Sequence, residues 1–403
     1  MMDNWKKVPL GELVTIQKGK ISEQSTYLIQ GFAPIINTDV LRGDVKVWGK
    51  IKGSVNCVED DVLILWDGER SGLCAIGYKG VLGSTFAKMN VSSELVPEYL
   101  FRVVDFNYDW IQGQRTGTGV PHVPKDLKTI FKVNFPPLPQ QQKIAKILST
   151  IDNVIEKTES AIAKYQAIKQ GLMHDLFTRG IDVNTGKLRP TPHEAPELYK
   201  ESALGLLPRD WEVEELGKEN ETYAGGTPNR SIEDFYKGDI PWVASGEVNK
   251  SFIHKTKESI TIDALRFSSA KMAPTESVLI AMYGATAAQV SMLKIEACTN
   301  QAVLAIIPNS LWNNYFIYYG LNYSKDRILF LAQGSGQPNL NKSMIDSTLF
   351  WKPKLDEQEI IIERLNVIES KIQTEQQALA KYQQVKAGLL QDLLTGEVEV
   401  AVD

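Results

Sequence analysis

The sequence repeats itself at a constant offset of 217 in the numbering, and this repeat constrains the fold more than any other feature. Residues 163–178 read AKYQAIKQGLMHDLFT and residues 380–395 read AKYQQVKAGLLQDLLT, with ten of sixteen positions identical. The same offset aligns residues 136–141 (PPLPQQ) with residues 353–358 (PKLDEQ). Further upstream the match weakens and the offset drifts. The sequence therefore predicts a tandem duplication in which the C-terminal parts of the two copies are similar and the N-terminal parts have diverged.

Each copy ends in a segment with the apolar spacing of a long coiled-coil helix. Apolar residues recur in steps of four and three over four heptads, a stripe narrower than that of a helix facing an ordinary core. Prolines stand just before each segment, where a missing N–H costs the helix nothing. The predicted helix–helix seam consists of Ile144, Leu148, Ile151, Ile155, Ile162, Tyr165, Leu172 and Leu176 in the first copy, and of Ile361, Leu365, Ile368, Ile372, Leu379, Tyr382, Leu389 and Leu393 in the second.

Two polar positions interrupt this seam at the same places in both copies. Thr158 aligns with Glu375, and Lys169 aligns with Lys386. A lone polar residue in a seam can fix register and partner choice at some cost in stability. A long lysine stem can equally reach past a loosely packed end into water. The sequence leaves both interpretations open.

The front of each copy predicts a compact domain that mixes helices and strands. Short apolar runs, such as residues 62–66 and 278–282, alternate with Gly and Asn turns. Residues 179–208 hold four prolines and no sustained apolar period, which predicts a connector on the surface. The predicted fold class is mixed α/β (α+β), with two globular domains and two long helices in a pseudo-twofold tandem repeat. The predicted parts are a first domain (1–138), a helix (139–178), the connector (179–208), a second domain (209–355), a second helix (356–395) and a tail (396–403).

The residue types that usually carry catalysis show no catalytic pattern. The three cysteines form no C-x-x-C pair, which excludes a disulfide scaffold and a cysteine-rich zinc site and fits a reducing cytoplasm. No nucleotide-binding, metalloprotease or nucleophile-elbow motif occurs, and the four histidines are scattered. His122 aligns with Asn339, which favours hydrogen bonding over acid–base catalysis. No signal peptide or membrane-spanning run is evident. We therefore expect no catalytic residue and no metal site.

The ordered arrangement of box, helix, connector, domain, box and helix resembles the DNA specificity (S) subunit of type I restriction-modification systems. The resemblance rests on the PLPQQ and KLDEQ boxes that end at Gln141 and Gln358, and on the KYQ…K-x-GL…DL helix endings. Gly205-x2-Pro208-x2-Trp211, which leads into the second half, adds to it. It covers the whole chain. One departure is Gln140, where the family usually has Glu, as Glu357 has here.

The resemblance implies how the chain acts and with what. Residues 1–138 and 209–355 would be target recognition domains, each reading one half of a split site in double-stranded DNA. The two helices would pack antiparallel and set the spacing, since a helix of about 39 residues spans about 58 Å. Two methyltransferase (M) subunits, which hold S-adenosylmethionine, would dock on the chain, and two restriction subunits, which use ATP and Mg²⁺, can join them. The chain itself would carry no cofactor, catalyse nothing and act in the cytoplasm, away from membranes.

The residues that touch DNA are predicted from aligned polar loops. Glycines in residues 114–119 and 333–339 let backbone N–H groups approach phosphate, and Arg115 and Gln337 have the length to reach a phosphate or base edge. The same loops can also be plain tight turns that close the domain. Trp66 and Tyr283 are interpreted as matching positions that face either core or DNA. The predicted DNA-binding residues are Lys18, Lys20, Arg70, Gln114, Arg115, Thr116, Thr118, Thr227, Asn229, Arg230, Asn300, Gln301, Gln333, Ser335, Gln337 and Asn339.

The net charge of −5 argues at first against a nucleic-acid partner. Residues 356–403 hold four basic and ten acidic residues, which leaves residues 1–355 near neutral at +1. This balance predicts weak DNA binding by the chain without its basic partner subunits. The alternatives are a coiled-coil scaffold whose globular domains bind protein or glycan, and an enzyme with an unfamiliar site. A scaffold would show no dependence of affinity on salt.

Overall fold

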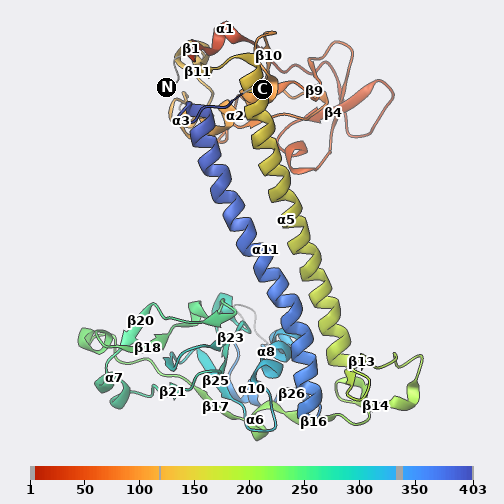
Figure 1. Cartoon of the computed structure of the whole chain (residues 1–403), viewed down its shortest axis with the longest axis vertical. Coiled ribbons are helices and arrows are strands. Elements are labelled where there is room, and N and C mark those ends of the chain that lie inside the picture. The colour runs from red at the N-terminus through yellow and green to blue at the C-terminus, as the bar shows by residue number, and fades with distance from the viewer. Residues whose placement is uncertain (1–4, 118, 333–338, 402–403) are drawn as a thin grey trace. The chain divides into compact units, whose positions relative to one another are not determined.

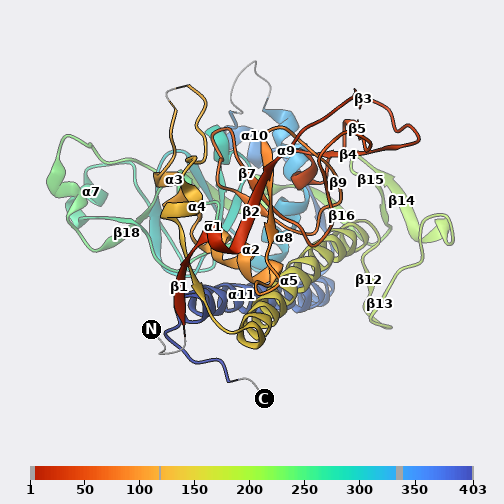
Figure 2. The ribbon, with the colours of Figure 1, turned by 90° about the horizontal axis from the view of Figure 1, so that it is seen from above.

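The computed structural model describes residues 5–117, 119–332 and 339–401 (Figure 1). The chain forms two compact units, Met1–Ala161 with Glu375–Asp403 and Ile162–Thr374. Two long helices, α5 (Leu138–Thr178) and α11 (Leu355–Thr395), each contribute one half to each unit. They lie side by side in Figure 1 and in Figure 2. The predicted mixed α/β class, with two β-rich domains and two long helices packed together, is confirmed.

The first unit is built on strand β7 (Val62–Leu65), whose four residues are all buried. Successive side chains of a strand point to opposite faces, so Val62 and Ile64 enter one core cluster and Leu63 and Leu65 enter another. A strand covered on both faces reads as a continuous apolar run, as residues 62–66 do. The described sheets of this unit have the strand orders β2-β10-β7-β8, β3-β5-β4-β9-β6 and β1-β11. Their other strands are β1 (Lys6–Pro9), β2 (Val14–Lys18), β3 (Gln24–Ser25), β4 (Phe32–Ile36), β5 (Trp48–Lys50), β6 (Asn56–Cys57), β8 (Cys74–Ala75), β9 (Gly80–Leu82), β10 (Phe86–Val91) and β11 (Lys132–Phe135).

The second unit repeats this plan around β22 (Val278–Ala281), which is also buried on both faces. Val278 and Ile280 enter one core cluster, and Leu279 and Ala281 enter another. The described sheets have the orders β17-β25-β22-β23-β19, β20-β18-β24-β21 and β16-β26. Their other strands are β16 (Glu212–Glu215), β17 (Glu221–Ala224), β18 (Ile240–Val243), β19 (Phe252–Ile253), β20 (Glu258–Ile260), β21 (Met272–Ala273), β23 (Val290–Leu293), β24 (Ala297–Thr299), β25 (Val303–Ile307) and β26 (Leu349–Lys352).

Short helices cover the sheets of both units. In α2, for example, Tyr99, Leu100 and Val103 are buried and belong to the main core cluster of the first unit. The helices are α1 (Leu10–Leu13), α2 (Pro97–Phe106), α3 (Tyr108–Gly113) and α4 (Leu127–Ile130) in the first unit, and α6 (Leu216–Glu219), α7 (Ile262–Arg266), α8 (Asn314–Tyr323), α9 (Lys325–Leu331) and α10 (Lys342–Asp346) in the second.

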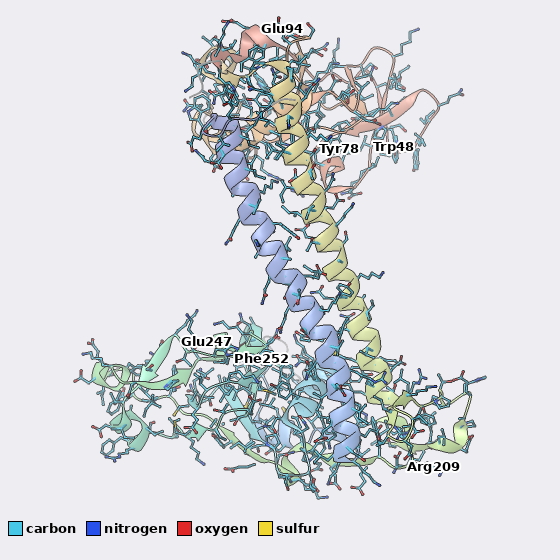
Figure 3. The ribbon with its side chains drawn as sticks, viewed as in Figure 1. Trp48, Tyr78, Glu94, Arg209, Glu247 and Phe252 are labelled. Carbon is cyan, nitrogen blue, oxygen red and sulfur yellow. The ribbon has the colours of Figure 1, made fainter. Side chains whose placement is uncertain are left out.

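The two long helices begin in the same way, through a buried glutamine of the repeated box. Gln141 accepts from the N–H of Val96 at 2.9 Å and donates to the carbonyls of Glu94 (labelled in Figure 3) and Pro136 at 3.0 and 2.9 Å. Gln358 makes the corresponding three bonds, accepting from Asn313 N–H and donating to the carbonyls of Leu311 and Pro353. Each glutamine bonds backbone groups of a domain loop and of the segment just before its own helix, so it fixes the start of the helix to its domain.

The segment between the repeats contains more structure than a plain connector. Residues 179–208 form two hairpins, one of β12 (Ile181–Asp182) with β13 (Lys187–Leu188) and one of β14 (Tyr199–Ser202) with β15 (Gly205–Pro208). The first hairpin turns at Gly186, where φ is +64°. None of the helices in the described part of the chain is long and apolar enough to cross a membrane.

Candidate DNA interface and helix anchors

In the first unit, the hairpin that joins β7 to β8 is tied to the loop of residues 114–122. The N–H of Gly68 donates to the carbonyl of Pro121 at 2.8 Å, and the N–H of Val123 donates to that of Trp66 at 2.9 Å. The guanidinium of Arg115 donates through Nη1 to the carbonyl of Glu69 at 2.7 Å. The loop and the hairpin therefore lie against each other, and together with Lys18 they are termed here the first loop cluster (Lys18 and residues 66–72, 114–117 and 119–122).

Asp67 is the centre of the first loop cluster. Its Oδ2 lies 2.7 Å from Lys18 Nζ, and its Oδ1 lies 2.7 Å from His122 Nδ1. The carboxylate is 18% exposed, whereas the Lys18 and His122 side chains are 52% and 46% exposed. A half-buried carboxylate thus holds two exposed basic side chains in place.

The predicted DNA-binding residues of the first unit do not all meet at Asp67. Lys18 pairs with Asp67, and Thr116 exchanges two backbone hydrogen bonds with His122. Arg70 shares the hairpin, but its side chain lines a separate pocket. Lys20 is exposed on a different segment, where its carbonyl accepts from Val55 N–H. Gln114 and Arg115 are exposed in the 114–122 loop, and Thr118 lies outside the described residues.

In the second unit, the predicted residues make separate contacts. The Thr227 hydroxyl donates to the side-chain oxygen of Gln301. The side chains of Asn229 and Asn300 instead accept from backbone N–H groups two residues ahead, at 3.0 and 3.2 Å, which is a turn-forming role. Asn339 is exposed and forms an isolated bridge with Tyr283. Gln333, Ser335 and Gln337 lie outside the described residues.

Arg230 has a fixed orientation in this unit. Its guanidinium carbon lies 4.1 Å from the centre of the Tyr236 ring and 5.0 Å from that of Trp242. Glu258 lies 2.8 Å from its Nη2, and the Arg230 side chain is still 53% exposed. Stacking on two aromatic rings holds the planar donor group of an arginine in one direction before any ligand arrives.

The interpretation of Trp66 and Tyr283 as matching positions is wrong. Trp66 N–H donates to the Thr85 carbonyl, and Met282 N–H donates to the Ala302 carbonyl. Thr85 and Ala302 align at the offset that runs through the repeat, whereas Trp66 and Met282 match at an offset smaller by one. A slip of one residue moves a side chain to the other face of a strand. Trp66 accordingly packs against the core as Met282 does, and the exposed Tyr283 corresponds to Asp67.

Asp67 was not among the residues predicted from the sequence, His122 was given only a hydrogen-bonding role, and Tyr283 was interpreted as facing either the core or DNA. Asp67 lies in a stretch that reads as an ordinary turn, Asp-Gly-Glu-Arg-Ser-Gly. Its link to His122 spans 55 residues and depends on the fold. The alignment of His122 with Asn339 could have indicated this site. To find Asp67 and Tyr283 as well, the two hairpins would have had to be aligned with an offset smaller by one residue.

The helix starts also carry a repeated tryptophan contact, with different chemistry in the two units. Trp5 Nε1 donates to Gln140 Oε1 at 3.0 Å, and Trp211 Nε1 donates to Glu357 Oε2 at 2.9 Å. Glu357 is 1% exposed, and it also accepts from the N–H of Ile181 at 2.7 Å. Arg189 Nη2, from the segment between the repeats, lies 3.1 Å from Glu357 Oε2. A buried charge is tolerated here because it is paired and fully hydrogen-bonded.

The predicted seam residues are buried or half-buried, and none of the sixteen is exposed. The two lysines at the polar seam positions make ion pairs between the helices, whereas the Thr158 hydroxyl donates to the carbonyl of Val154 within its own helix. Lys386 Nζ lies 2.7 Å from Asp152 Oδ1, and Lys169 pairs with Glu369. The structure thus favours register-setting pairs over lysine stems that reach into water. The N-terminal half of each helix pairs with the C-terminal half of the other, so the two helices run antiparallel within each unit.

The titratable groups in the described part of the chain show neither an activated cysteine nor a metal site. Burial raises the pKa of the Cys57 and Cys298 thiols to about 11 and that of Cys74 well above its usual value. A protonated thiol is a poor nucleophile. In residues 5–117, 119–332 and 339–401, no group of three His, Cys, Asp or Glu side chains is placed to hold a metal ion.

Comparison with known proteins places the chain in a family. The model of the type I restriction modification DNA specificity domain matches residues 2–165 and 208–384. The MjaVIII specificity subunit of a type I restriction enzyme from Methanocaldococcus jannaschii is 26% identical over 99% of this chain and 94% of its own length. The HindI specificity subunit from Haemophilus influenzae is 24% identical over 79% of this chain and 81% of its own length.

Solved structures show the same fold. The S subunit of a type I restriction-modification system from M. genitalium matches with a TM-score of 0.64 at 16% identity, over 99% of this chain and 97% of that one. A chain from work on complex assembly and conformational transition of the type I system matches with a TM-score of 0.58, also at 16% identity, over 99% of both chains. The chain therefore belongs to the type I restriction-modification DNA specificity family: it is a specificity subunit, which recognises the DNA target sequence, carries no cofactor and is not catalytic.

Proposed function

We propose that the chain reads a bipartite, asymmetric site in double-stranded DNA, with residues 1–138 reading one half and residues 209–355 reading the other. The observation that carries this proposal is that the two units share their strand arrangement and helix anchors but differ in their exposed loops. The two units share strand order around β7 and β22 and share the glutamine anchors of α5 and α11. Their exposed loops differ in residue type and charge. Shared scaffolds with different loops suit two different half-sites.

We propose that the helices set the distance between the half-sites. Each has 41 residues, so each spans about 62 Å at ~1.5 Å per residue. That length equals roughly 18 base pairs at ~3.4 Å each. The seam ion pairs hold the helices in one register, which a ruler requires. The proposed DNA-contacting surface is the first loop cluster together with Thr227, Arg230, Gln301 and Asn339 in the second unit.

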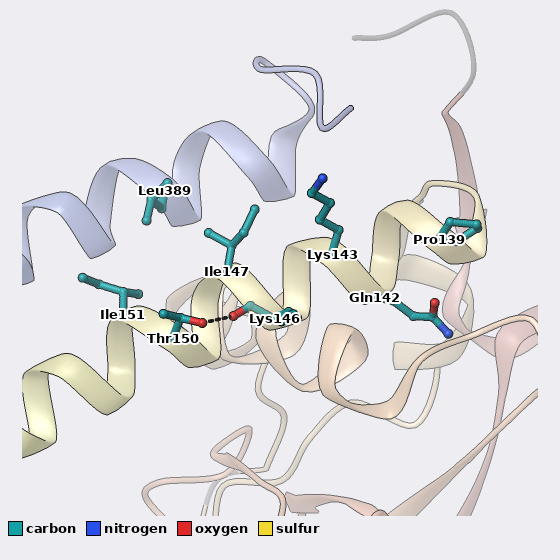
Figure 4. A pocket seen from close by; sticks show the side chains of 8 residues that line it. All are labelled: Pro139, Gln142, Lys143, Lys146, Ile147, Thr150, Ile151 and Leu389. Carbon is teal, nitrogen blue, oxygen red and sulfur yellow. Dashed lines mark hydrogen bonds between the residues drawn. The ribbon is translucent and has the colours of Figure 1, made fainter. Parts of the chain in front are cut away.

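We further propose that two methyltransferase subunits dock on the helices. A groove of about 740 Å³ lies along the start of α5, with Ile147, Ile151 and Leu389 in its lining beside Lys143 and Lys146 (Figure 4). A groove of about 700 Å³ lies along the start of α11 and includes Glu359, Ile362, Glu363 and Val367. Glu359, Glu363 and Val367 each align in the repeat with a residue that lines the first groove. Two matched grooves suit two copies of one partner.

Exchange of the first domain tests the bipartite reading. Replacing residues 1–135 with the corresponding front of another family member is expected to change one half-site and leave the other half-site and the spacing unchanged, because the second unit keeps its own loops and core. Sequencing of the methylated sites in cells that carry the chimaera with its methyltransferase subunit checks this result. Loss of sequence preference in both half-sites would contradict it.

Salt dependence tests the predicted need for basic partners. Residues 1–355 carry a charge near +1, so few phosphates are neutralised by this chain alone. We expect the complex with methyltransferase subunits to bind the target at least about tenfold more tightly than the chain alone, with a steeper fall of log affinity against log salt. Fluorescence anisotropy at several salt concentrations measures both quantities. A flat salt response of both samples would favour the scaffold alternative.

A further inference from the structure

The same place in the two recognition domains carries different chemistry. In the first domain it holds the Lys18–Asp67–His122 group described above. Lys18 stands opposite Ala87 in the β2–β10 pair, and Ala224 stands opposite Leu304 in the matching β17–β25 pair. Ala87 and Leu304 align at the offset of the repeat, so Ala224 corresponds to Lys18.

The other two positions follow from the loop bridges. Asp67 bridges His122 in the first domain, and Tyr283 bridges Asn339 in the second. The matching set in the second domain is therefore Ala224, Tyr283 and Asn339. An ion-paired group of three in one domain is replaced by a small apolar, an aromatic and an amide side chain in the other.

In the first domain, Asp67 acts as a positioning residue. Both of its oxygens are taken by Lys18 and His122, so it offers little to a ligand itself. A carboxylate accepts hydrogen bonds only, so His122 donates through Nδ1 to Asp67, and the His122 side chain stays 46% exposed. Lysine donors select the O6 and N7 acceptors of guanine, and an imidazole nitrogen that accepts complements the N4 amino group of cytosine. This set suits a G·C pair.

In the second domain, the chemistry suits the other pair. Asn339 is exposed, and Tyr283 is 40% exposed. An asparagine amide can bond adenine at N6 and N7 together, and an apolar ring face packs against the methyl group of thymine. Ala224 leaves no long cation at this place to select guanine.

We infer that these matched positions are specificity-determining: Lys18 and His122, oriented by Asp67, select a G·C pair in the first half-site, whereas Tyr283 and Asn339 select an A·T pair in the second. The inference rests on the proposed bipartite function and adds to it the base pair that each set prefers. It assigns a role to Asp67, His122 and Tyr283 in addition to the loop residues predicted from the sequence.

The test is selection from a pool of random DNA duplexes by the full chain in complex with its methyltransferase subunit. Lys18→Ala is expected to lower the enrichment of G·C at one position of the first half-site by about tenfold. Lys18→Ala, Asp67→Tyr and His122→Asn together should shift that position toward A·T. Tyr283→Ala should lower the A·T enrichment in the second half-site alone. Asp44→Asn is the matched control, because it removes a lysine–aspartate pair of 2.8 Å on the same unit's surface, and we expect no change.

The outcomes are separable. Unchanged enrichment in the first half-site with Lys18→Ala, an exposed position, overturns the inference while the bipartite function stands. A wild-type complex that enriches no split site overturns the proposed function and this inference with it. In each variant, enrichment of the untouched half-site reports that the complex is folded and bound.

Discussion

Arg189→Ala is expected to lower the free energy of unfolding of the second unit by about 3–5 kcal/mol. Arg189 is 11% exposed and pairs with Glu357, which is 1% exposed at the start of α11. Without the guanidinium, the carboxylate stays buried with only the donors of Trp211 and Ile181. Removing one partner of a buried pair costs far more than the pair itself contributes, because the remaining charge is left in a poorly polar surrounding.

Glu357→Gln is the matched comparison, because the first unit already holds Gln140 in the corresponding contact with Trp5. The amide oxygen can still accept from Trp211, and Arg189 keeps Asp210 at 2.9 Å. We expect Glu357→Gln to lower the free energy of unfolding by less than Arg189→Ala does. We expect the double variant to be more stable than Arg189→Ala alone. Urea unfolding of the full chain, with hydrogen exchange at residues 179–216 as the local readout, measures the order of the variants. A loss below about 1 kcal/mol in Arg189→Ala would contradict the assignment.

A heptad inserted in each long helix is expected to lengthen the spacer between the half-sites. The antiparallel pairs Asp152–Lys386 and Lys169–Glu369 place the centre of the seam near residues 160 and 378. Seven residues added after Ser160 and seven after Gln377 keep the apolar repeat and add about 10.5 Å, or roughly three base pairs. Because both domains then miss their register on the original site, its affinity should fall by about a hundredfold or more.

The measurement is selection from duplexes in which only the spacer length varies. Seven residues inserted in the exposed turn at residues 183–186 provide the control, because the chain becomes equally longer while both helices keep their length. We expect the control to select the original spacer. If the double insertion also selected the original spacer, the helices would not act as the ruler.

The long helices were the most predictable part of the fold. Their apolar steps persist over many turns, so local errors average out, and the helices observed begin at Leu138 and Leu355, one residue before the predicted starts. The buried strands β7 and β22 were also visible as apolar runs. Periodicity reports which face of an element is buried, and it suffices where that face is long and regular.

The candidate site was much less predictable, because it depends on contacts between distant loops. Asp67 and His122 are 55 residues apart and meet only in the folded domain. Their counterparts in the second copy lie at offsets that differ by one residue, and no local pattern in the sequence marks that difference. In the sequence, the departure at Gln140 indicates only the loss of a charge near a helix start. The structure shows that the charge of Glu357 is balanced by Arg189, 168 residues away, in a segment that the first unit lacks in this form.

The two grooves at the helix starts occupy matching places but carry opposite charges. Lys143 and Lys146 line the first groove, and Glu359 and Glu363 line the second. Two identical partners would therefore meet one basic and one acidic groove, and a single partner surface cannot complement both equally. The two grooves would bind the partner with different affinities, and salt would change these affinities in opposite directions. Assembly would then be sequential, with a complex of one partner accumulating first and the ionic strength deciding how readily the second arrives.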